Sequence, residues 1–193
     1  EAVKQIEGAM KDPTTANWSK TYYVAGQAYY KQFEAELLKR QTGSDFSQEV
    51  ISSALKNCVN ANLKCAELDQ QPDAKGKVKP KYTKEVVKNL KDYSESLIVE
   101  GQSHQKLGEN EKAIDMMEAY VNLAKSDVMK SENMTSNSIY NDVKFLIVNL
   151  SANIPNKRIT MIQYMNELKD AGYKEETMYE WLSDTYSKEK QYD

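Results

Sequence analysis

The sequence predicts an all-α fold of about eight helices arranged as antiparallel hairpins. Apolar residues recur every three or four positions through most of the 193 residues, which is the spacing of one face of an α-helix. The chain has only 7 Gly and 4 Pro, fewer than many short strands joined by tight turns would need. Apolar residues make up 40% and charged residues 28%, a composition typical of neither membrane proteins nor disordered chains.

Turn and capping residues divide the chain into these helices. Pro13 and Gly172 are typical of helix ends, whereas Ser47, Thr83 and Pro155 are typical of helix starts. The expected helices cover residues 1–11, 17–40, 47–69, 83–106, 110–125, 139–153, 155–171 and 175–190. The expected loops include two long polar stretches at 70–81 and 126–138.

Two helices show which residues should face the core. The helix 1–11 places Ala2, Ile6 and Ala9 on one face. The third helix carries a stripe of mostly small residues at spacings of three and four: Ile51, Ala54, Cys58, Ala61, Cys65 and Leu68. Two helical turns separate the cysteines by about 10 Å, too far for a disulfide. We therefore expect both as small buried side chains.

A pattern of large, small and aromatic residues recurs along the chain. Its clearest copy lies on either side of the turn 107–109: Leu97, Gly101 and His104, then Ala113, Met117 and Tyr120. A second copy contains Phe145, Val148, Asn149 and Ala152, then Met161, Met165 and Leu168. Partial copies are Tyr22, Ala25, Gly26 and Tyr29, and, 34 residues after Phe145, Tyr179, Leu182, Ser183 and Tyr186. The glycine lets two helices cross closely, and the small residue on the second helix receives the ring from the first.

This pattern resembles the tetratricopeptide repeat (TPR) family, whose 34-residue unit is a helical hairpin. The resemblance implies a right-handed superhelix of stacked hairpins in one domain covering residues 1–193. The expected parts are a lone helix at 1–11 and hairpins at 15–70, 82–125, 139–172 and 175–193. The last hairpin resembles a first helix and its turn only, so we expect the natural chain to continue past Asp193.

The resemblance also implies a ligand groove lined by the first helix of each hairpin. The candidates beside its core positions are Lys20, Tyr23, Gln27, Tyr30, Lys31, Ile98, Gln102, Gln105 and Lys106. On the last helix they are Glu180, Asp184 and Lys188. Chaperone-binding relatives hold a C-terminal carboxylate with a Lys and an Asn four apart. Here Tyr23 with Gln27, and Ile98 with Gln102, occupy those places, so we do not expect chaperone-tail binding.

An aromatic cluster near the N-terminus has two possible roles. It consists of Trp18, Tyr22, Tyr23, Tyr29 and Tyr30. The rings could form a wall for a peptide or glycan, or they could hold one hairpin against its neighbours. Tyr22 and Tyr29 match core positions of the repeat, whereas Tyr23 and Tyr30 are equally compatible with the groove and are the best binding candidates.

The residues that metal or nucleophilic chemistry needs are scarce. The chain has one His and two Cys, and it lacks an HExxH, a GxSxG and a P-loop motif. His104 occupies an aromatic position of the repeat, which indicates a core role. We therefore expect neither a metal, a cofactor nor an enzyme.

A run of lysines marks the second half of the loop 70–81 and the start of the next helix. It consists of Lys75, Lys77, Lys79, Lys81, Lys84, Lys88 and Lys91. The run could be a solvated surface, or it could attract an acidic partner or anionic lipid. The net charge of −3 argues against a general nucleic-acid binder.

The sequence thus predicts a non-catalytic scaffold that binds a protein or peptide in a TPR groove. The alternative is a glycan or small ligand on the tyrosine-rich surface, and a third possibility is an enzyme subunit that only positions a partner. No stretch is apolar enough to span a membrane. The excess of Lys over Arg, with the repeat, suggests a bacterial protein, either of the cell envelope after signal-peptide removal or of the cytoplasm.

Overall fold

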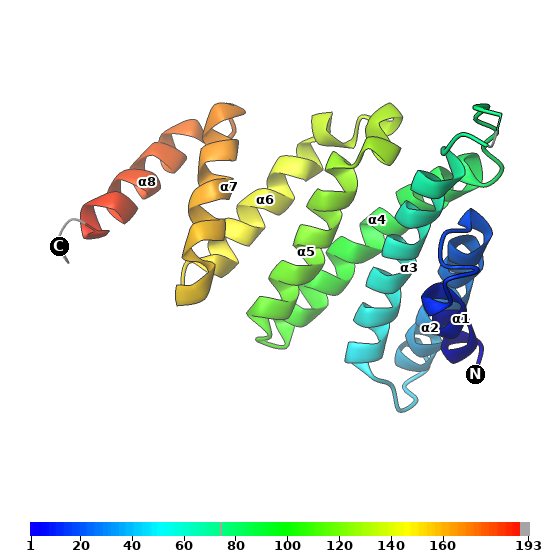
Figure 1. Ribbon diagram of the computed structural model, residues 1–193. Helices are drawn as coiled ribbons and strands as arrows, with labels where there is room; N and C mark the ends of the chain where they lie inside the picture. Colours follow the sequence, from blue (N-terminus) through cyan, green and yellow to red (C-terminus); the bar gives the residue numbers. More distant parts are fainter. Residues whose placement is uncertain (74, 190–193) are drawn as a thin grey trace. The chain divides into compact units, whose positions relative to one another are not determined.

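The computed structural model describes residues 1–73 and 75–189, which contain helices and no strand (Figure 1). This confirms the all-α prediction, and most helices begin and end within a few residues of the expected positions. The α-helices are α1 (Ala2–Lys11), α2 (Ser19–Gln41), α3 (Gln48–Asp69), α4 (Thr83–Lys106), α5 (Asn110–Lys125), α6 (Ser138–Ser151), α7 (Arg158–Asp170) and α8 (Glu175–Glu189). The short 3-10 helices are η1 (Asp127–Glu132), η2 (Met134–Ser136) and η3 (Pro155–Lys157).

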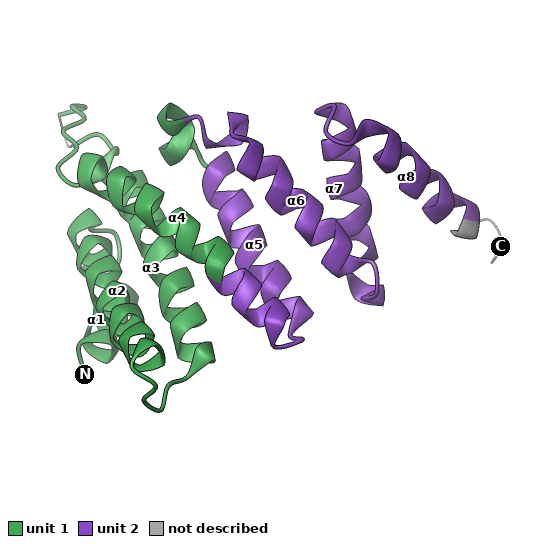
Figure 2. Cartoon of the chain, turned by 180° about the vertical axis from the view of Figure 1, so that it is seen from behind, with its two compact units in different colours: residues 1–99, 126–132 green, residues 100–125, 133–193 purple. Residues whose placement is uncertain are grey.

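The chain forms two compact units, and the boundary between them falls within α4 (Figure 2). Unit 1 contains residues 1–99 and 126–132. Unit 2 contains residues 100–125 and those from 133 onward. In unit 1, α2 lies against α1 and α3, and in unit 2, α6 lies against α5 and α7, and α7 against α8, as expected for helical hairpins. The assignment of all residues to one repeat domain stays a prediction.

Left-handed glycines end several helices as expected. Gly108 has a φ of +76° and follows α4, and the N–H of Glu109 donates to the carbonyl of His104 at 3.0 Å. Gly172 has a φ of +66° and follows α7, and the N–H of Tyr173 donates to the carbonyl of Leu168 at 2.9 Å. A side chain would strain the backbone at both positions, which explains why glycine occupies them. Both turns reverse the direction of the chain.

The start of α4 is capped differently from the prediction. Thr83 is the first residue of the helix, and the cap comes from Asp69 at the end of α3. Oδ2 of Asp69 accepts hydrogen bonds from the N–H groups of Lys81 (2.7 Å), Tyr82 (2.7 Å) and Thr83 (2.9 Å), and from Oγ1 of Thr83 (2.9 Å). Burial acts to raise the pKa of Asp69, but these hydrogen bonds outweigh it and lower the pKa below 3.8. The carboxylate thereby closes the loop 70–81.

The core of unit 1 joins four helices. Ala25 and Tyr29 of α2 and Cys58 and Ala61 of α3 are buried together, as the stripe on α3 predicts. The half-buried side chains against this cluster are Val3, Ile6 and Met10 of α1, Tyr30 of α2 and Tyr93 of α4. Of the expected α1 face, Ile6 packs against this cluster, whereas Val3 and Met10 take the places expected of Ala2 and Ala9 because their larger side chains reach the core.

The close crossing of helices at glycine is confirmed in both units. A Cβ at Gly26 would lie 2.5 Å from Nδ2 of the buried Asn62 on α3. A Cβ at Gly101 would lie 3.0 Å from Cγ of Met117 and 3.2 Å from the carbonyl oxygen of Ala113 on α5. All three distances are shorter than ordinary van der Waals contact, so only glycine fits without a shift.

The stretch 126–138 is more ordered than predicted. It forms η1 and η2 instead of an irregular loop. Met129 of η1 is fully buried, and Glu132 at the end of η1 pairs with Lys91 at 2.8 Å. One apolar anchor and one ion pair thus hold a segment whose composition is otherwise polar.

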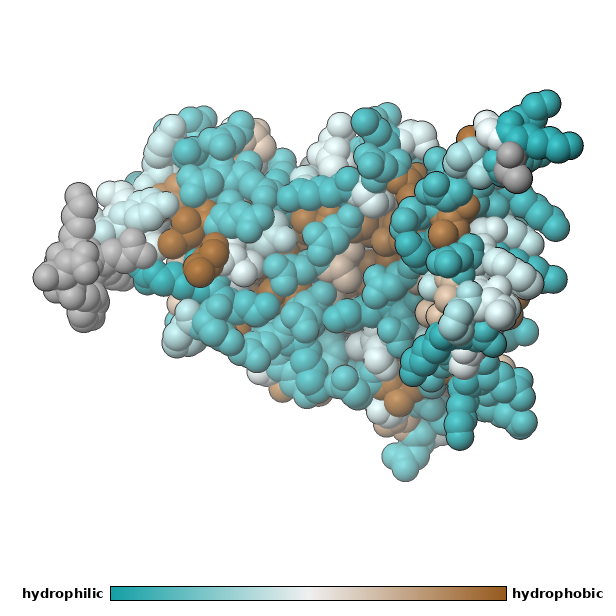
Figure 3. Space-filling model, in the orientation of Figure 1, coloured by the Kyte–Doolittle hydropathy of each residue, from teal (hydrophilic) through white to brown (hydrophobic). Residues whose placement is uncertain are grey.

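The surface visible in Figure 3 is mainly hydrophilic, with apolar side chains in small separate groups. Among the described residues, no helix is long and apolar enough to cross a membrane.

Candidate functional site

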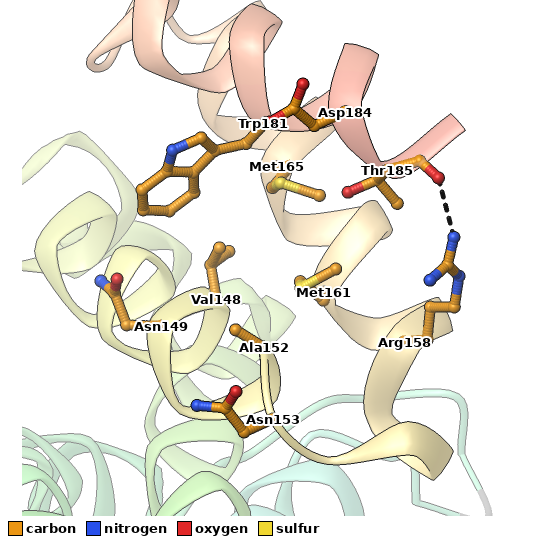
Figure 4. A pocket seen from close by; sticks show the side chains of 10 residues that line it. All are labelled: Val148, Asn149, Ala152, Asn153, Arg158, Met161, Met165, Trp181, Asp184 and Thr185. Carbon is orange, nitrogen blue, oxygen red and sulfur yellow. Dashed lines mark hydrogen bonds between the residues drawn. The ribbon is translucent and has the colours of Figure 1, made fainter. Parts of the chain in front are cut away.

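A pocket of about 480 Å³ lies within unit 2, and its lining comes from α6, α7, α8 and the turn that follows α6 (Figure 4). Its apolar lining consists of Val148, Ala152, Met161, Met165 and Trp181. Its polar lining consists of Asn149, Asn153, Arg158, Asp184 and Thr185. The volume falls in the range of about 300–1,000 Å³ that small-ligand sites occupy.

The apolar floor of the pocket is fixed by the core beneath it. Val148 of α6 and Met165 of α7 are 0% and 1% exposed. The ring of Trp181 on α8 is stacked on that of Phe145, with centroids 5.8 Å apart and planes at 16°. The burial of Val148 and Met165 holds the floor in place, and the ring stacking holds Trp181 in place. A lining that is already ordered lowers the entropic cost of binding a ligand.

The polar rim offers both hydrogen-bond donors and acceptors. Nδ2 of Asn149 donates to the carbonyl of Phe145 at 2.9 Å, which orients its amide. A guanidinium nitrogen of Arg158 donates to the carbonyl of Thr185 at 2.9 Å (Figure 4). Asn149, Asn153 and Asp184 are exposed at the rim. An apolar floor below amide and carboxylate groups suits an apolar side chain whose flanking backbone is hydrogen-bonded by the rim.

The predicted candidates of unit 2 are divided between this pocket and other surfaces. Asp184 lines the pocket, and Glu180 is exposed one turn earlier on α8. Gln102, Gln105 and Lys106 are exposed on α4. The side chain of Lys188 lies outside the described residues.

The predicted tyrosines of unit 1 both lie against other tyrosines. The ring of Tyr23 is stacked on Tyr82 with centroids 4.6 Å apart, and its hydroxyl donates to Oε1 of Glu85 at 2.7 Å. This hydrogen bond, with burial, raises the pKa of Tyr23. The ring of Tyr30 is stacked on Tyr93 with centroids 4.5 Å apart. Each ring therefore has one face covered.

The other predicted candidates of unit 1 surround these rings. Lys20, Gln27 and Lys31 are exposed on α2, and Ile98 is half-buried on α4. The predicted set is thus divided between the two units.

His104 and the cysteines occupy positions in the core. His104 is 1% exposed, and its Nδ1 lies 2.6 Å from Oε2 of Glu109 in the turn that follows. Cys58 and Cys65 are buried and unbridged, and burial raises the pKa of each thiol to about 12. Among the described residues, no three His, Cys, Asp or Glu side chains are grouped so that they could hold a metal ion.

The sequence did not single out several pocket residues. Trp181 lies on the expected last helix but outside the repeat positions, and Arg158 and Asn153 flank the turn before α7. The one feature of the sequence that could have indicated this pocket is Asn149, a polar residue at a position where the repeat has a small one. Two pairs of repeat positions 34 residues apart behave differently. Val148 and Leu182 are both buried, whereas Phe145 is half-buried and Tyr179 is 55% exposed.

Comparisons of the chain with protein-family models, with curated proteins and with solved structures find no match.

Proposed function

We propose that this chain is a TPR-type scaffold that binds an extended peptide segment of a partner protein and carries out no catalysis. The binding site is the pocket of unit 2 between α6 and α8. The observation that carries this proposal is the combination of a preformed apolar floor with asparagine and aspartate groups at its rim.

The repeated hairpin supports the choice of family. Gly101 contacts Ala113 and Met117 across a short turn, as the small-to-large pairing of the repeat requires. The same pairing logic places α6 and α8 as the first helices of their hairpins, and these are the helices that line the TPR groove. The pocket therefore lies on the surface that the resemblance assigns to a ligand.

An extended peptide matches the pocket in both shape and polarity. In an extended chain, every second side chain points to the same face, about 6.6 Å apart. One bulky apolar side chain can enter between Trp181 and Met161, while the amides of Asn149 and Asn153 bridge peptide N–H and C=O groups. The rim then provides the hydrogen bonds that the peptide backbone needs and that the apolar floor cannot provide.

Glycan binding on the tyrosine-rich surface is the weaker alternative. Sugars stack on open aromatic faces, but Tyr23 and Tyr30 each have one face covered by Tyr82 and Tyr93. Each ring is also half-buried.

A peptide library tests the proposal. We would select random dodecapeptides displayed on phage against the wild-type chain, synthesise the best peptide with a fluorophore, and measure its Kd by fluorescence anisotropy. The double variant Asn149→Ala/Asp184→Ala removes the rim of the pocket. The control Asn122→Ala/Glu176→Ala likewise removes one amide and one carboxylate, from exposed positions of unit 2 that do not line the pocket.

We expect the rim variant to bind the selected peptide about tenfold more weakly, because two hydrogen-bonding contacts are lost. The control should bind as the wild type does. Failure to select any peptide, or equal binding by the two double variants, would refute this function.

A further inference from the structure

A second recess, of about 610 Å³, lies within unit 1 along the start of α4. Its lining comes from the end of the loop 70–81, the first turns of α4 and the end of η1. The residues are Pro80, Lys81, Thr83, Lys84, Val87, Lys88, Lys91, Ser131 and Glu132. The recess therefore contains four of the seven lysines of the run noted in the sequence.

The lysines of this recess form one stripe. Lys84, Lys88 and Lys91 follow one another at spacings of four and three, so they share a face of the helix, and Lys81 immediately precedes the helix. All four are exposed. Glu132 is the one acidic residue in the lining, and its Oε2 lies 2.8 Å from Nζ of Lys91. The lining thus carries an excess of positive charge.

The charge of the recess comes from these side chains and not from the helix end. The N–H groups at the start of α4 already donate to Asp69, whose carboxylate balances the positive end of the helix dipole. Glu85 of the same turn is also occupied, because it accepts the hydrogen bond of Tyr23. The ammonium groups of Lys84 and Lys88 have no carboxylate other than Glu132 among the lining residues.

We propose that this recess binds an extended acidic segment of a partner protein, rich in Asp or Glu. Lys84 and Lys88 are separated by a rise of about 6 Å along the helix. Alternate side chains of an extended peptide are separated by about 6.6 Å. Two carboxylates at alternate positions can therefore meet both ammonium groups at once. Glu132 on Lys91 is an example of the same contact made within the chain.

The shape of the recess favours a peptide over a membrane or a nucleic acid. A bilayer surface is flat on this scale, and a duplex is a wide cylinder, so neither enters a hollow between α4 and η1. A single extended chain can enter it, and the stems of the lysines with Val87 and Pro80 supply apolar walls for it. This site shares no residue with the pocket of unit 2, so it stands independently of the proposed function.

The test uses a fluorescein-labelled peptide of alternating Ser and Glu, with an alternating Ser and Gln peptide as its neutral counterpart. Kd would be measured by anisotropy for the wild type, for Lys84→Gln/Lys88→Gln and for the control Lys4→Gln/Lys11→Gln. The control removes the same charge from two exposed positions of α1. Circular dichroism would check that both variants fold.

We expect the wild type to bind the Glu peptide, with an affinity that falls as salt rises, and to ignore the Gln peptide. The Lys84/Lys88 variant should bind about fivefold to tenfold more weakly, and the control should be unchanged. The proposal is overturned if the Glu peptide fails to bind at millimolar concentration, or if both double variants lose the same affinity. It is also overturned if phosphatidylserine vesicles, and not the peptide, bind in a manner that depends on Lys84 and Lys88.

Discussion

Replacing Glu167 should destabilise unit 2 far more than replacing its buried partner Lys144. Nζ of Lys144 on α6 lies 3.5 Å from Oε2 of Glu167 on α7, and the side chain of Lys144 is 4% exposed. Glu167 also pairs with Lys125 at 3.1 Å, and the Lys144 ammonium lies 4.5 Å from the centroid of the Tyr140 ring. Burial lowers the pKa of Lys144 and outweighs the opposing attraction of Glu167.

The size of each loss in stability depends on whether the substitution leaves a buried charge without its partner. Glu167→Gln leaves a buried ammonium group without its carboxylate, and breaking such a pair costs about 3–5 kcal/mol. Glu167 is 28% exposed and the Tyr140 ring remains, so we expect a loss at or just below the lower end of that range, about 2–3 kcal/mol. Lys144→Met removes the buried charge and keeps a side chain of similar size, so its effect should stay within about 1 kcal/mol of the wild type.

Urea unfolding followed by far-UV circular dichroism measures both effects. The double variant Lys144→Met/Glu167→Gln should recover most of the stability that Glu167→Gln loses. The lowered pKa of Lys144 adds a pH signature: the unfolded chain holds this proton more readily, so stability should rise as the pH increases towards 10.5. Lys144→Met should lose that rise. A loss of stability in Lys144→Met as large as that in Glu167→Gln would refute the reasoning.

Three further outcomes are expected. Asp69→Asn should lower the free energy of unfolding by about 1–2 kcal/mol at neutral pH. Because the folded-state pKa of Asp69 is lowered, the stabilisation by its carboxylate is present above pH 3.8 and disappears as the pH falls through that pKa. The difference in stability between variant and wild type in urea titrations should therefore shrink in acid. Cys58 and Cys65 should react with Ellman's reagent only on unfolding, since burial raises the pKa of each thiol to about 12; reaction in the native state would contradict their burial. Gly26→Ala should lose about 1–2 kcal/mol in thermal or urea unfolding, because the new Cβ would meet the buried amide of Asn62; a gain in stability, as helix propensity alone predicts, would contradict the close crossing.

The sequence predicts backbone features best because a single residue type specifies each of them. Gly172 was expected to end a helix, and its φ of +66° shows the left-handed conformation that few other residues adopt. Gly101 was expected at a close helix crossing, and its Cα faces Ala113 and Met117. Such features depend on local sterics, so they can be identified without knowing the rest of the fold.

Features that depend on a distant partner could not be predicted in this way. Ala2, Ile6 and Ala9 have helical spacing, but so do Val3, Ile6 and Met10, and the position of α2 and α3 decides between the two sets. The cap of α4 is another example. Asp69 precedes Thr83 by 14 residues, and nothing in the local sequence indicates that its carboxylate returns to that helix.

The candidate site shows the same division. The repeat pattern made Asp184 a groove candidate from its position beside a core residue, and Asp184 lines the pocket of unit 2. It did not identify Trp181, whose role depends on stacking against Phe145 from another helix. It made Tyr23 and Tyr30 the best binding candidates, but their stacking on Tyr82 and Tyr93 could not be predicted from the spacing.

Stability and the two proposed binding surfaces can be altered separately, because exposed residues of these surfaces alternate with buried core residues along the same helices. Asn149 is exposed at the pocket, and the preceding Val148 is fully buried. Lys88 is exposed in the recess of unit 1, and Leu90 two residues later is fully buried. A substitution at Asn149 or Lys88 therefore changes a surface without opening a cavity, whereas one at Val148 or Leu90 would weaken the core. Loss of binding in the exposed variants with unchanged unfolding curves would thus locate the ligands on these two surfaces and would separate recognition from folding.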